Sequence, residues 1–316
     1  MRLPGTSERS AYKLKKQYEH LIVNGIRWVD SLPDHEGSVG GKGFPILMNG
    51  GLVPEANAWV CPTMFQITKR EADIVAKGTG AKANPHIHDG DEMYLILGDK
   101  GAVMFRITLG CDVYHLESPC AVYIPAGLPH AIEAERFTEG AYGGSCQIYL
   151  DKNYVTKPVP DEPLKADDTE SLIVRDIQWV ESLPDHEGSV GGKGFPILMN
   201  GSLVPQANAW VCPTLFLAIQ RQVRIVEAGT GPKANPHIHD GDEMYLILGA
   251  PGMVEFEITL GEDGYHLKSP CAVYIPAGVP HSIRASKFTE GAYGGSCQIY
   301  LDRDYVTRPV PVKGHS

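Results

Sequence analysis

Three histidines and one glutamate recur with metal-ligand spacing in each half of the chain. The first set is His86, His88, Glu92 and His130, and the second is His237, His239, Glu243 and His281. One residue separates the first two histidines of each set, and the third follows the second by 42 residues. Imidazole and carboxylate ligands suit Fe, Mn, Ni, Cu or Zn, and no thiolate in the set selects among them. The sequence therefore predicts two sites per chain for a divalent transition metal.

The two sets belong to a much larger internal repeat. Trp28 matches Trp179 and Cys61 matches Cys212, and both pairs are 151 residues apart. The match continues without a gap from residues 28–159 to residues 179–310. Such self-similarity indicates a duplicated module, and two modules of this size each bury a core of their own. The pseudo-twofold relation resembles a fused homodimer, and further association into a homo-oligomer is possible.

The segments outside the repeat differ from it in composition. Residues 13–20 are strongly charged and predict an amphipathic helix that packs on the core. Residues 157–170 are rich in proline and acidic residues, which is typical of an extended linker. We therefore expect a partly helical N-terminal extension over 1–27, a first module over 28–156, a linker over 157–175 and a second module over 176–316.

Within each module the apolar residues alternate with a period of two, which predicts β-strands and an all-β fold. Val103, Phe105 and Ile107 alternate with polar positions, and the second copy differs from the first mainly at those polar positions. A solvent-facing side of a strand permits such changes. By the same comparison, His130 shares the unchanged side of its strand with Ile132, so we expect His130 to face the interior.

The strand pattern also predicts how the other ligands meet. Residues i and i+2 of a strand point the same way, so His86 and His88 project side by side into one interior. Glu92 follows the turn at residues 89–91 and is expected to begin the neighbouring strand, about 4.8 Å away. His130 arrives from a more distant strand. Four ligands then converge on one point.

These residues resemble the two sequence motifs of the cupin superfamily. The first motif is matched by Gly80, His86, His88, Glu92 and Gly98, although the last glycine occurs one residue early. It is matched again by Gly231, His237, His239, Glu243 and Gly249. The second motif is matched by Pro125, Gly127 and His130, and again by Pro276, Gly278 and His281. The sequence departs from this motif at Pro119, Pro270, Ala134 and Ala285. The resemblance covers nearly all of the chain from Trp28 onward. It implies a bicupin, with two small antiparallel barrels that each hold a metal in the mouth.

Two further pairs of residues are candidates for contact with a substrate inside the barrels. Tyr94 and its counterpart Tyr245 share the inward direction of the glutamate ligands, so they could position a substrate, donate a proton or simply fill the interior. Gln147 and its counterpart Gln298 could line the cavity, as could Tyr149. The sequence leaves open which face of that strand points inward.

A glycine-rich segment over residues 32–45 recurs unchanged at residues 183–196. Lys42 and Lys193 in these segments offer a cation to an anionic substrate. Alternatively, the segment is an arm that wraps the neighbouring module. His35 and His186 stand beside acidic residues in it, and we expect both to be exposed.

Composition excludes several classes of partner. A formal net charge of -10 disfavours binding to a nucleic-acid backbone. The first 25 residues are too polar for a signal peptide or a membrane span. Seven cysteines without a CxxC pair indicate reduced thiols, and we expect a cytoplasmic protein whose partner is a small molecule.

The leading functional hypothesis is an Fe(II)-dependent oxygenase of the dioxygenase type that acts on a small oxygenated organic acid or a phenolic compound. Three imidazoles and a carboxylate leave open positions for substrate and dioxygen on an octahedral ion. One alternative is a redox-neutral decarboxylase, isomerase or lyase that uses Mn, Ni or Zn, by analogy with the bicupin oxalate decarboxylases, whose lid sequences this chain lacks. A second alternative is a metal-holding protein that binds a ligand without turnover.

Overall fold

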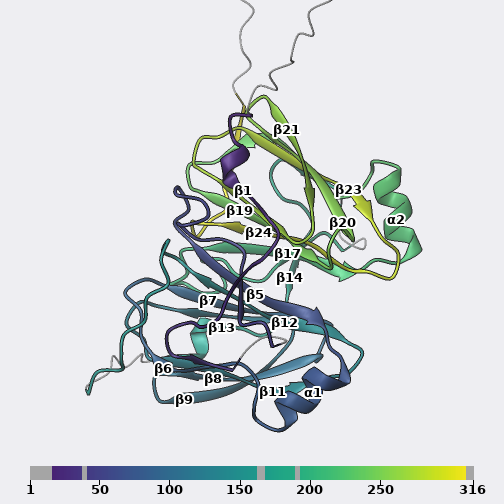
Figure 1. The fold of residues 1–316 in the computed structure, drawn as a ribbon. Coiled ribbons are helices and arrows are strands. Elements are labelled where there is room, and N and C mark those ends of the chain that lie inside the picture. The colour runs from purple at the N-terminus through teal and green to yellow at the C-terminus, as the bar shows by residue number, and fades with distance from the viewer. Residues whose placement is uncertain (1–15, 38–40, 162–167, 189–192, 311–316) are drawn as a thin grey trace, which may run out of the picture.

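The computed structural model describes residues 16–37, 41–161, 168–188 and 193–310, whose strands gather in two similar halves (Figure 1). The first half contains β2 (Arg27–Val29), β3 (His35–Glu36), β4 (Phe44–Ile46), β5 (Trp59–Gln66), α1 (Lys69–Ala76), β6 (Lys82–His86), β7 (Glu92–Gly98), β8 (Val103–Leu109), β9 (Asp112–Glu117), β10 (Cys120–Ile124), β11 (His130–Phe137) and β12 (Tyr142–Tyr149). The second half contains β14 (Gln178–Val180), β15 (His186–Glu187), β16 (Phe195–Ile197), β17 (Trp210–Leu217), α2 (Gln220–Glu227), β18 (Lys233–Ile238), β19 (Glu243–Gly249), β20 (Val254–Leu260), β21 (Asp263–Lys268), β22 (Cys271–Ile275), β23 (His281–Phe288), β24 (Tyr293–Tyr300) and β25 (Arg308–Pro309).

Each half is built from two main antiparallel sheets. In the first half the sheet orders are β13-β10-β7-β12-β5 and β3-β6-β11-β8-β9, where β13 spans Ile173–Val174. In the second half they are β1-β22-β19-β24-β17 and β15-β18-β23-β20-β21, where β1 spans Ile22–Asn24. The prediction of an all-β chain with two tandem antiparallel barrels is therefore confirmed.

The alternating strands face the way that the sequence predicts. Val103, Phe105 and Ile107 of β8 are buried, whereas Arg106 between them is exposed. On β11, His130 is buried together with Ile132. The apolar side of each strand thus fills the barrel, and the same side carries the third histidine of each ligand set.

The two halves exchange strands. β1 precedes the first module in sequence, yet it pairs with β22 of the second module, with Ile22 opposite Val273. β13 precedes the second module, yet it pairs with β10 of the first module, with Val174 opposite Ala121. Figure 1 shows β1, in purple, within the green and yellow half. Each module therefore completes a sheet of the other.

Because of this exchange, parts of the N-terminal extension and of the predicted linker form strands. In the described part of the extension the only helical turn is a 3-10 turn, η1 (Glu19–Leu21), directly before β1. Residues 13–15 of the helix predicted over 13–20 lie outside the described residues, and residues 16–18 form no helix, so the prediction is wrong for the part that the structure describes. Likewise, the last part of the predicted linker forms a second 3-10 turn, η2 (Glu170–Leu172), and then β13.

Reciprocal contacts also join the modules. The rings of Tyr142 and Tyr293 stack with their centroids 4.1 Å apart. The backbone N–H of Asn57 donates to the hydroxyl of Tyr274 at 3.1 Å, and the matching bond runs from Asn208 to Tyr123 at 3.2 Å. One apolar core contains side chains of both modules. The modules therefore pack as symmetric partners.

A short helix that the strand pattern does not predict follows β5 in each module. Helix α1 begins after Thr68, whose side chain accepts from the backbone N–H of Arg70 while Glu71 accepts from the backbone N–H of Thr68. This Thr-x-x-Glu capping box was the available sequence signal. Among the residues described, no helix is long and apolar enough to cross a membrane.

Candidate metal centre

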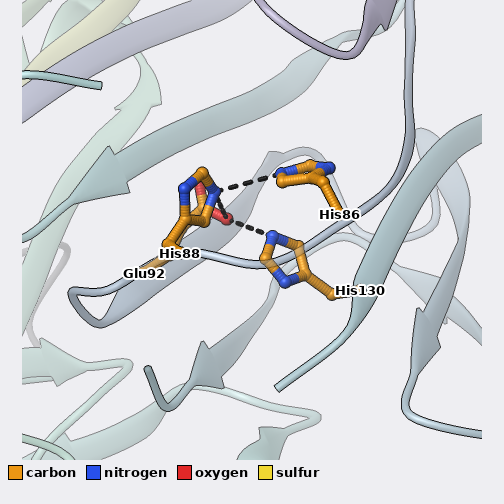
Figure 2. Close-up of side chains that lie close together, drawn as sticks. All are labelled: His86, His88, Glu92 and His130. Atoms are coloured by element: carbon orange, nitrogen blue, oxygen red, sulfur yellow. Dashed lines mark hydrogen bonds and ion pairs between the residues drawn. The ribbon is translucent and has the colours of Figure 1, made fainter. Parts of the chain in front are cut away.

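The structure brings together both predicted ligand sets. In each set the four ligand atoms lie within 4.8 Å of one another, and all four side chains are buried (Figure 2). His86 ends β6 and lies opposite His130, which begins β11 in the same sheet. Glu92 begins β7 in the other sheet, so the prediction that Glu92 starts the strand next to His86 is wrong. Because the turn at residues 89–91 carries the chain from one sheet to the other, the ligands close on the site from both sides.

Backbone carbonyls fix the orientation of all three imidazoles. In each case Nδ1 lies at hydrogen-bond distance from a carbonyl oxygen, which can only accept, so Nδ1 carries the hydrogen and Nε2 is left with a lone pair. The distances are 2.6 Å from His86 to Asn84, 2.6 Å from His88 to Val155 and 2.9 Å from His130 to Leu128. The second set repeats them at 2.6 Å from His237 to Asn235, 2.6 Å from His239 to Val306 and 2.9 Å from His281 to Val279.

The converging atoms are all electron donors. Nε2 of His86 and Nε2 of His88 lie 3.0 Å apart, and each presents a lone pair. Nε2 of His130 lies 2.8 Å from Oε2 of Glu92, but neither atom makes a geometrically sound hydrogen bond within the described residues. Lone pairs that are buried this close together raise the free energy of the folded state unless a cation lies among them. The residues therefore fit a metal ion, which takes neutral imidazole nitrogens and an ionised carboxylate.

The electrostatics of the site favour that protonation state for most of the ligands. Burial, assisted by the neighbouring His130, lowers the pKa of His86 to about 4. Burial alone would raise the pKa of Glu92, but the adjacent His130 and His88 outweigh it and hold the pKa well below its usual range. In the second set, burial likewise lowers the pKa of His237 to about 4. In contrast, burial lowers the pKa of His88 and His281 but the adjacent glutamates outweigh it and raise both values, so these two imidazoles release protons when a cation binds.

Gln147 holds the carboxylate ligand. Its amide nitrogen donates to Oε1 of Glu92 at 2.6 Å and also contacts the hydroxyl of Tyr154 at 3.1 Å. Oε2 of Glu92 is thereby left to face the imidazoles. Gln298 does the same for Glu243 at 2.6 Å. Carboxylate ligands are commonly oriented by hydrogen bonds of this kind.

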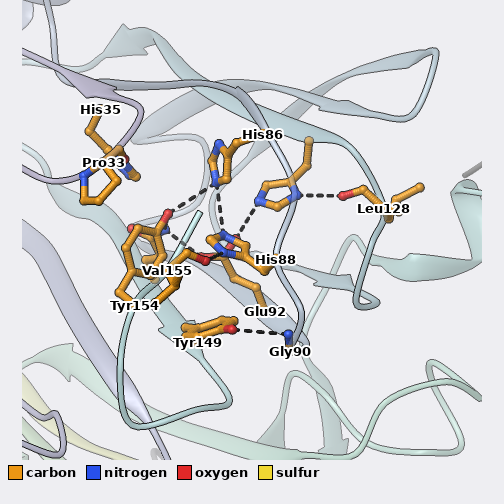
Figure 3. Close-up of polar contacts among 12 residues, drawn as sticks. Pro33, His35, His86, His88, Gly90, Glu92, Leu128, Tyr149, Tyr154 and Val155 are labelled. Atoms are coloured by element: carbon orange, nitrogen blue, oxygen red, sulfur yellow. Dashed lines mark hydrogen bonds and ion pairs between the residues drawn. The ribbon is translucent and has the colours of Figure 1, made fainter. Parts of the chain in front are cut away.

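The segment that follows β12 crosses the ligand set like a strap (Figure 3). Within it, the ring of Tyr154 stacks on Trp59 with centroids 4.5 Å apart, and its hydroxyl lies 3.3 Å from Nε2 of His86. The carbonyl of Val155 is the partner of His88. Lys157 then exchanges backbone hydrogen bonds with Ile87 at 2.9 and 3.0 Å. We call residues 151–157 the strap.

The sequence analysis did not identify Tyr154 or its counterpart Tyr305. In the second module Tyr305 stacks on Trp210 at 4.5 Å and lies 3.4 Å from Nε2 of His237. The available signal was the unchanged Tyr-Val-Thr sequence at residues 154–156 and 305–307. Its closeness to the ligands depends on the path of the chain after β12, which strand alternation does not define.

A mostly apolar cavity lies inside each barrel beside the ligand set. Its volume is about 90 Å³ in the first module and about 50 Å³ in the second. The apolar lining of the first cavity consists mainly of Phe44, Phe65, Phe105, Ile132 and Phe137. Ser145 and Gln147 also line it, which resolves which face of β12 points inward. Gln147 therefore touches both the cavity and the ligand Glu92.

Tyr94 lines the same cavity, as its predicted inward direction requires. Its hydroxyl is buried and has no hydrogen-bond partner among the described residues, and the same holds for Tyr245 in the second cavity. Burial raises the pKa of Tyr94 well above its usual value, so the hydroxyl keeps its proton. A buried hydroxyl without a partner normally costs free energy. Tyr94 therefore brings a protonated hydroxyl to the wall of the cavity, close to Glu92.

His35 and His186 are not exposed, contrary to the prediction. Each is partly buried and lines the cavity of its module. β3 pairs with β6 and so brings His35 over the barrel, where its ring lies 5.4 Å from Phe44 and 5.7 Å from Tyr154. The signal in the sequence was that His35 recurs within an unchanged segment rather than a variable one.

Lys42 and Lys193 lie outside both cavities. Nζ of Lys42 lies 5.6 Å from the ring centroid of Trp28, and Nζ of Lys193 lies 5.5 Å from that of Trp179. Neither lysine lines a cavity beside a ligand set. Direct contact between Lys42 and a substrate held at the metal is therefore not part of this geometry.

The fold is similar to that of several solved structures of oxalate decarboxylase from Bacillus subtilis. Two mutant forms of that enzyme match with TM-scores of 0.51 and 0.54 and 11% sequence identity, over 85% and 91% of this chain and 76% and 77% of theirs. A structure from work on the Mn(II) centres of the enzyme matches with a TM-score of 0.53 and 12% identity, over 87% of this chain and 77% of that chain. No family model and no curated protein matches the sequence. At this identity the similarity concerns the fold alone.

Proposed function

We propose that this chain, a bicupin by its fold and its two ligand sets, is a metal-dependent enzyme that performs redox-neutral chemistry, such as decarboxylation, on a short-chain carboxylic acid. One observation carries the proposal. A buried set of three imidazoles and a carboxylate adjoins an apolar cavity lined by a tyrosine whose hydroxyl makes no geometrically sound hydrogen bond within the described residues. Such a site offers a place for a metal-bound acid group, a place for an apolar body and a proton donor between them.

The size and lining of the cavity support a small substrate. An apolar cavity of roughly 150 Å³ holds benzene, and the first cavity is smaller, at about 90 Å³. Its walls are largely phenylalanine and aliphatic side chains. A short aliphatic acid fits this space better than the phenolic compound that the sequence also suggested.

The side chains of the site have distinct roles in this proposal. When bound, the metal supplies a Lewis acid that polarises the oxygen atoms of the substrate. Tyr94 donates from its hydroxyl to the substrate in the cavity and holds the proton that is transferred. Gln147 keeps the carboxylate of Glu92 turned toward the imidazoles. The strap and Tyr154 exclude water from the reacting atoms.

The redox-neutral reaction is better supported than the oxygenase that the sequence suggested first. The solved structures named above are those of a decarboxylase, and one of them concerns Mn(II) centres. We therefore propose Mn(II) as the first metal to test, before Fe(II), Ni, Cu and Zn. The module limits at residues 156 and 176 and a cytoplasmic location remain predictions.

The proposal is tested with Mn(II)-loaded protein and a panel of short-chain mono- and dicarboxylic acids, oxalate included, with and without dioxygen. We expect turnover without dioxygen and release of carbon dioxide or an isomerised acid. In Tyr94→Phe we expect a loss of about 100-fold in kcat, the lower end for an acid–base group, with Mn(II) content unchanged. Turnover that requires dioxygen would instead establish the oxygenase, and tight binding of an acid without any product would establish a binding protein.

A further inference from the structure

A wide groove runs between the two modules on one side of the molecule. Its volume is about 1090 Å³. The first module contributes Trp28, Lys42 and Phe65 to its walls, and the second contributes Met253 and Tyr293, among others. The groove is therefore far larger than the cavity beside either ligand set.

A third hollow lies between the groove and the first cavity and shares lining residues with each of them. The groove shares Trp28, Lys42 and Phe65 with this hollow, which measures about 330 Å³ and lies at the surface of the first module. That hollow in turn shares Thr63, Phe65 and Glu71 with the cavity beside the first ligand set. Phe65 is thus a wall of all three spaces, and it stands where a molecule would pass from the groove to the cavity.

The pseudo-symmetric side of the molecule differs at two positions that matter for such a groove. Gly25 and Pro251 line the groove, and their counterparts are Asp176 and Lys100. Nζ of Lys100 lies 3.7 Å from a carboxylate oxygen of Asp176, so two side chains meet where the first side has a glycine and a proline.

The mouth of the passage is positively charged. Lys42 lies over the ring of Trp28, and the guanidinium of Arg70 lies beside Gly41. Within the described part of the chain, neither cation has a carboxylate at ion-pair distance, although the carboxylate of Glu71, next to Arg70 in sequence, lines the hollow as well. An anion that approaches the groove therefore meets Lys42 first, and its path inward passes between Arg70 and Glu71.

We propose that the anionic substrate reaches the first metal site through this groove, that Phe65 is the gate of the passage, and that Lys42 and Arg70 draw the anion to its mouth. The first site then exchanges substrate faster than the second. This inference rests on the proposed function in one respect, namely that the cavity holds the substrate. The existence of the passage, however, is open to a test that requires neither metal nor turnover.

Cys61 lines the first cavity and its counterpart Cys212 lines the second, and both thiols are buried. The probes are methanethiosulfonate reagents that carry either a sulfonate or a trimethylammonium group. The thiolate sulfur attacks the reagent, a mixed disulfide forms and methanesulfinate leaves. Rates at each cysteine are measured by peptide mass spectrometry on the full chain and divided by the rate of free cysteine with the same reagent.

We expect Cys61 to react severalfold faster than Cys212, and faster with the anionic than with the cationic reagent. Phe65→Ala should speed the reaction of Cys61 and Phe65→Trp should slow it, whereas the matched changes at Phe216 should leave Cys61 unchanged. Lys42→Glu should lower the ratio of anionic to cationic rates at Cys61 by about tenfold at low salt. Lys193→Glu is the control and should not change that ratio.

Equal rates at Cys61 and Cys212 that are insensitive to Phe65 would overturn the proposed passage. A dependence on Phe65 without any effect of Lys42→Glu would overturn the electrostatic part. Both readings are obtained on metal-free protein, so they stand apart from the activity test. A protein with an open passage and no turnover of any acid would disprove the proposed function and leave the passage intact.

Discussion

The side-chain amide nitrogen of Gln147 lies 2.6 Å from Oε1 of Glu92, so one uncharged residue determines which oxygen of the carboxylate faces the three imidazoles. We predict that Gln147→Leu, which keeps the volume but not the donor, lowers metal affinity at the first site about 10- to 100-fold, as is usual when the partner of a metal ligand is lost. Competition with a fluorescent chelator measures this. Gln298→Leu is the matched control and should weaken only the second site. Equal affinities in the variant and the parent would show that Gln147 does not orient the ligand.

Removal of one ligand should empty one site and spare the other. The two sets share no residue, so protein purified without added metal should carry about two equivalents, as two four-ligand sets predict. His86→Ala and His237→Ala should each retain about one equivalent, because three remaining ligands hold the ion poorly. Mass spectrometry of the metals gives the numbers. Loss of both ions in either variant would contradict independent sites.

The stack between Tyr154 and Trp59 should stabilise the strap. Tyr154→Ala removes a ring that contacts Trp59 and two of the histidines, and we expect a loss of about 2 kcal/mol in the free energy of unfolding and faster loss of metal to EDTA. Tyr154→Phe keeps the ring and should cost about 1 kcal/mol. Chemical denaturation and the kinetics of metal release measure the two effects. Wild-type metal release in Tyr154→Ala would show that the strap does not cover the site.

Thiol reactivity should separate one cysteine from six. Cys111 is exposed, whereas the other six free cysteines are buried. Burial raises the pKa of Cys120 to about 12 and that of Cys271 to about 12, so their thiolate fraction at pH 8 is very small. A bulky aromatic disulfide reagent should therefore titrate one thiol per native chain within minutes and seven after denaturation. Two or more fast thiols in the native chain would contradict the burial of the others.

Cleavage between the modules should not separate them. β1 remains bound to the second module and β13 to the first after a cut between residues 161 and 168. A protease site inserted there should give two fragments on a denaturing gel but a single particle in size-exclusion chromatography. Elution of separate halves would show that the exchanged strands do not hold the modules together.

The sequence was sufficient to predict the class of fold, the repeat and the convergence of eight side chains into two buried sets. Alternation determines which side of a strand is buried, which is why His130 and Tyr94 were placed correctly. Alternation does not determine which strand pairs with which, and for that reason Glu92 was expected beside His86 rather than in the opposite sheet. Pairing depends on turns and on contacts between distant segments, and a local pattern contains neither.

Residues that reach the site from outside the strands were the hardest to predict. Tyr154 and His35 lie in irregular or very short elements, where no periodicity assigns a direction. Their positions follow from hydrogen bonds such as that between Val155 and His88, which join segments 67 residues apart. Residues that repeat unchanged in both modules were the remaining clue, and Tyr154 and His35 both meet it.

The exchange of β1 and β13 has a consequence for how the protein behaves on dilution. Two separate modules that completed each other's sheets would dissociate as their concentration fell, because each contact between them would be bimolecular. In this chain the two partners are covalently joined, so each module meets the strand that it needs at an effective concentration in the millimolar range for a short linker. The completed sheets that carry Glu92 and Glu243 are therefore independent of how much protein a cell contains.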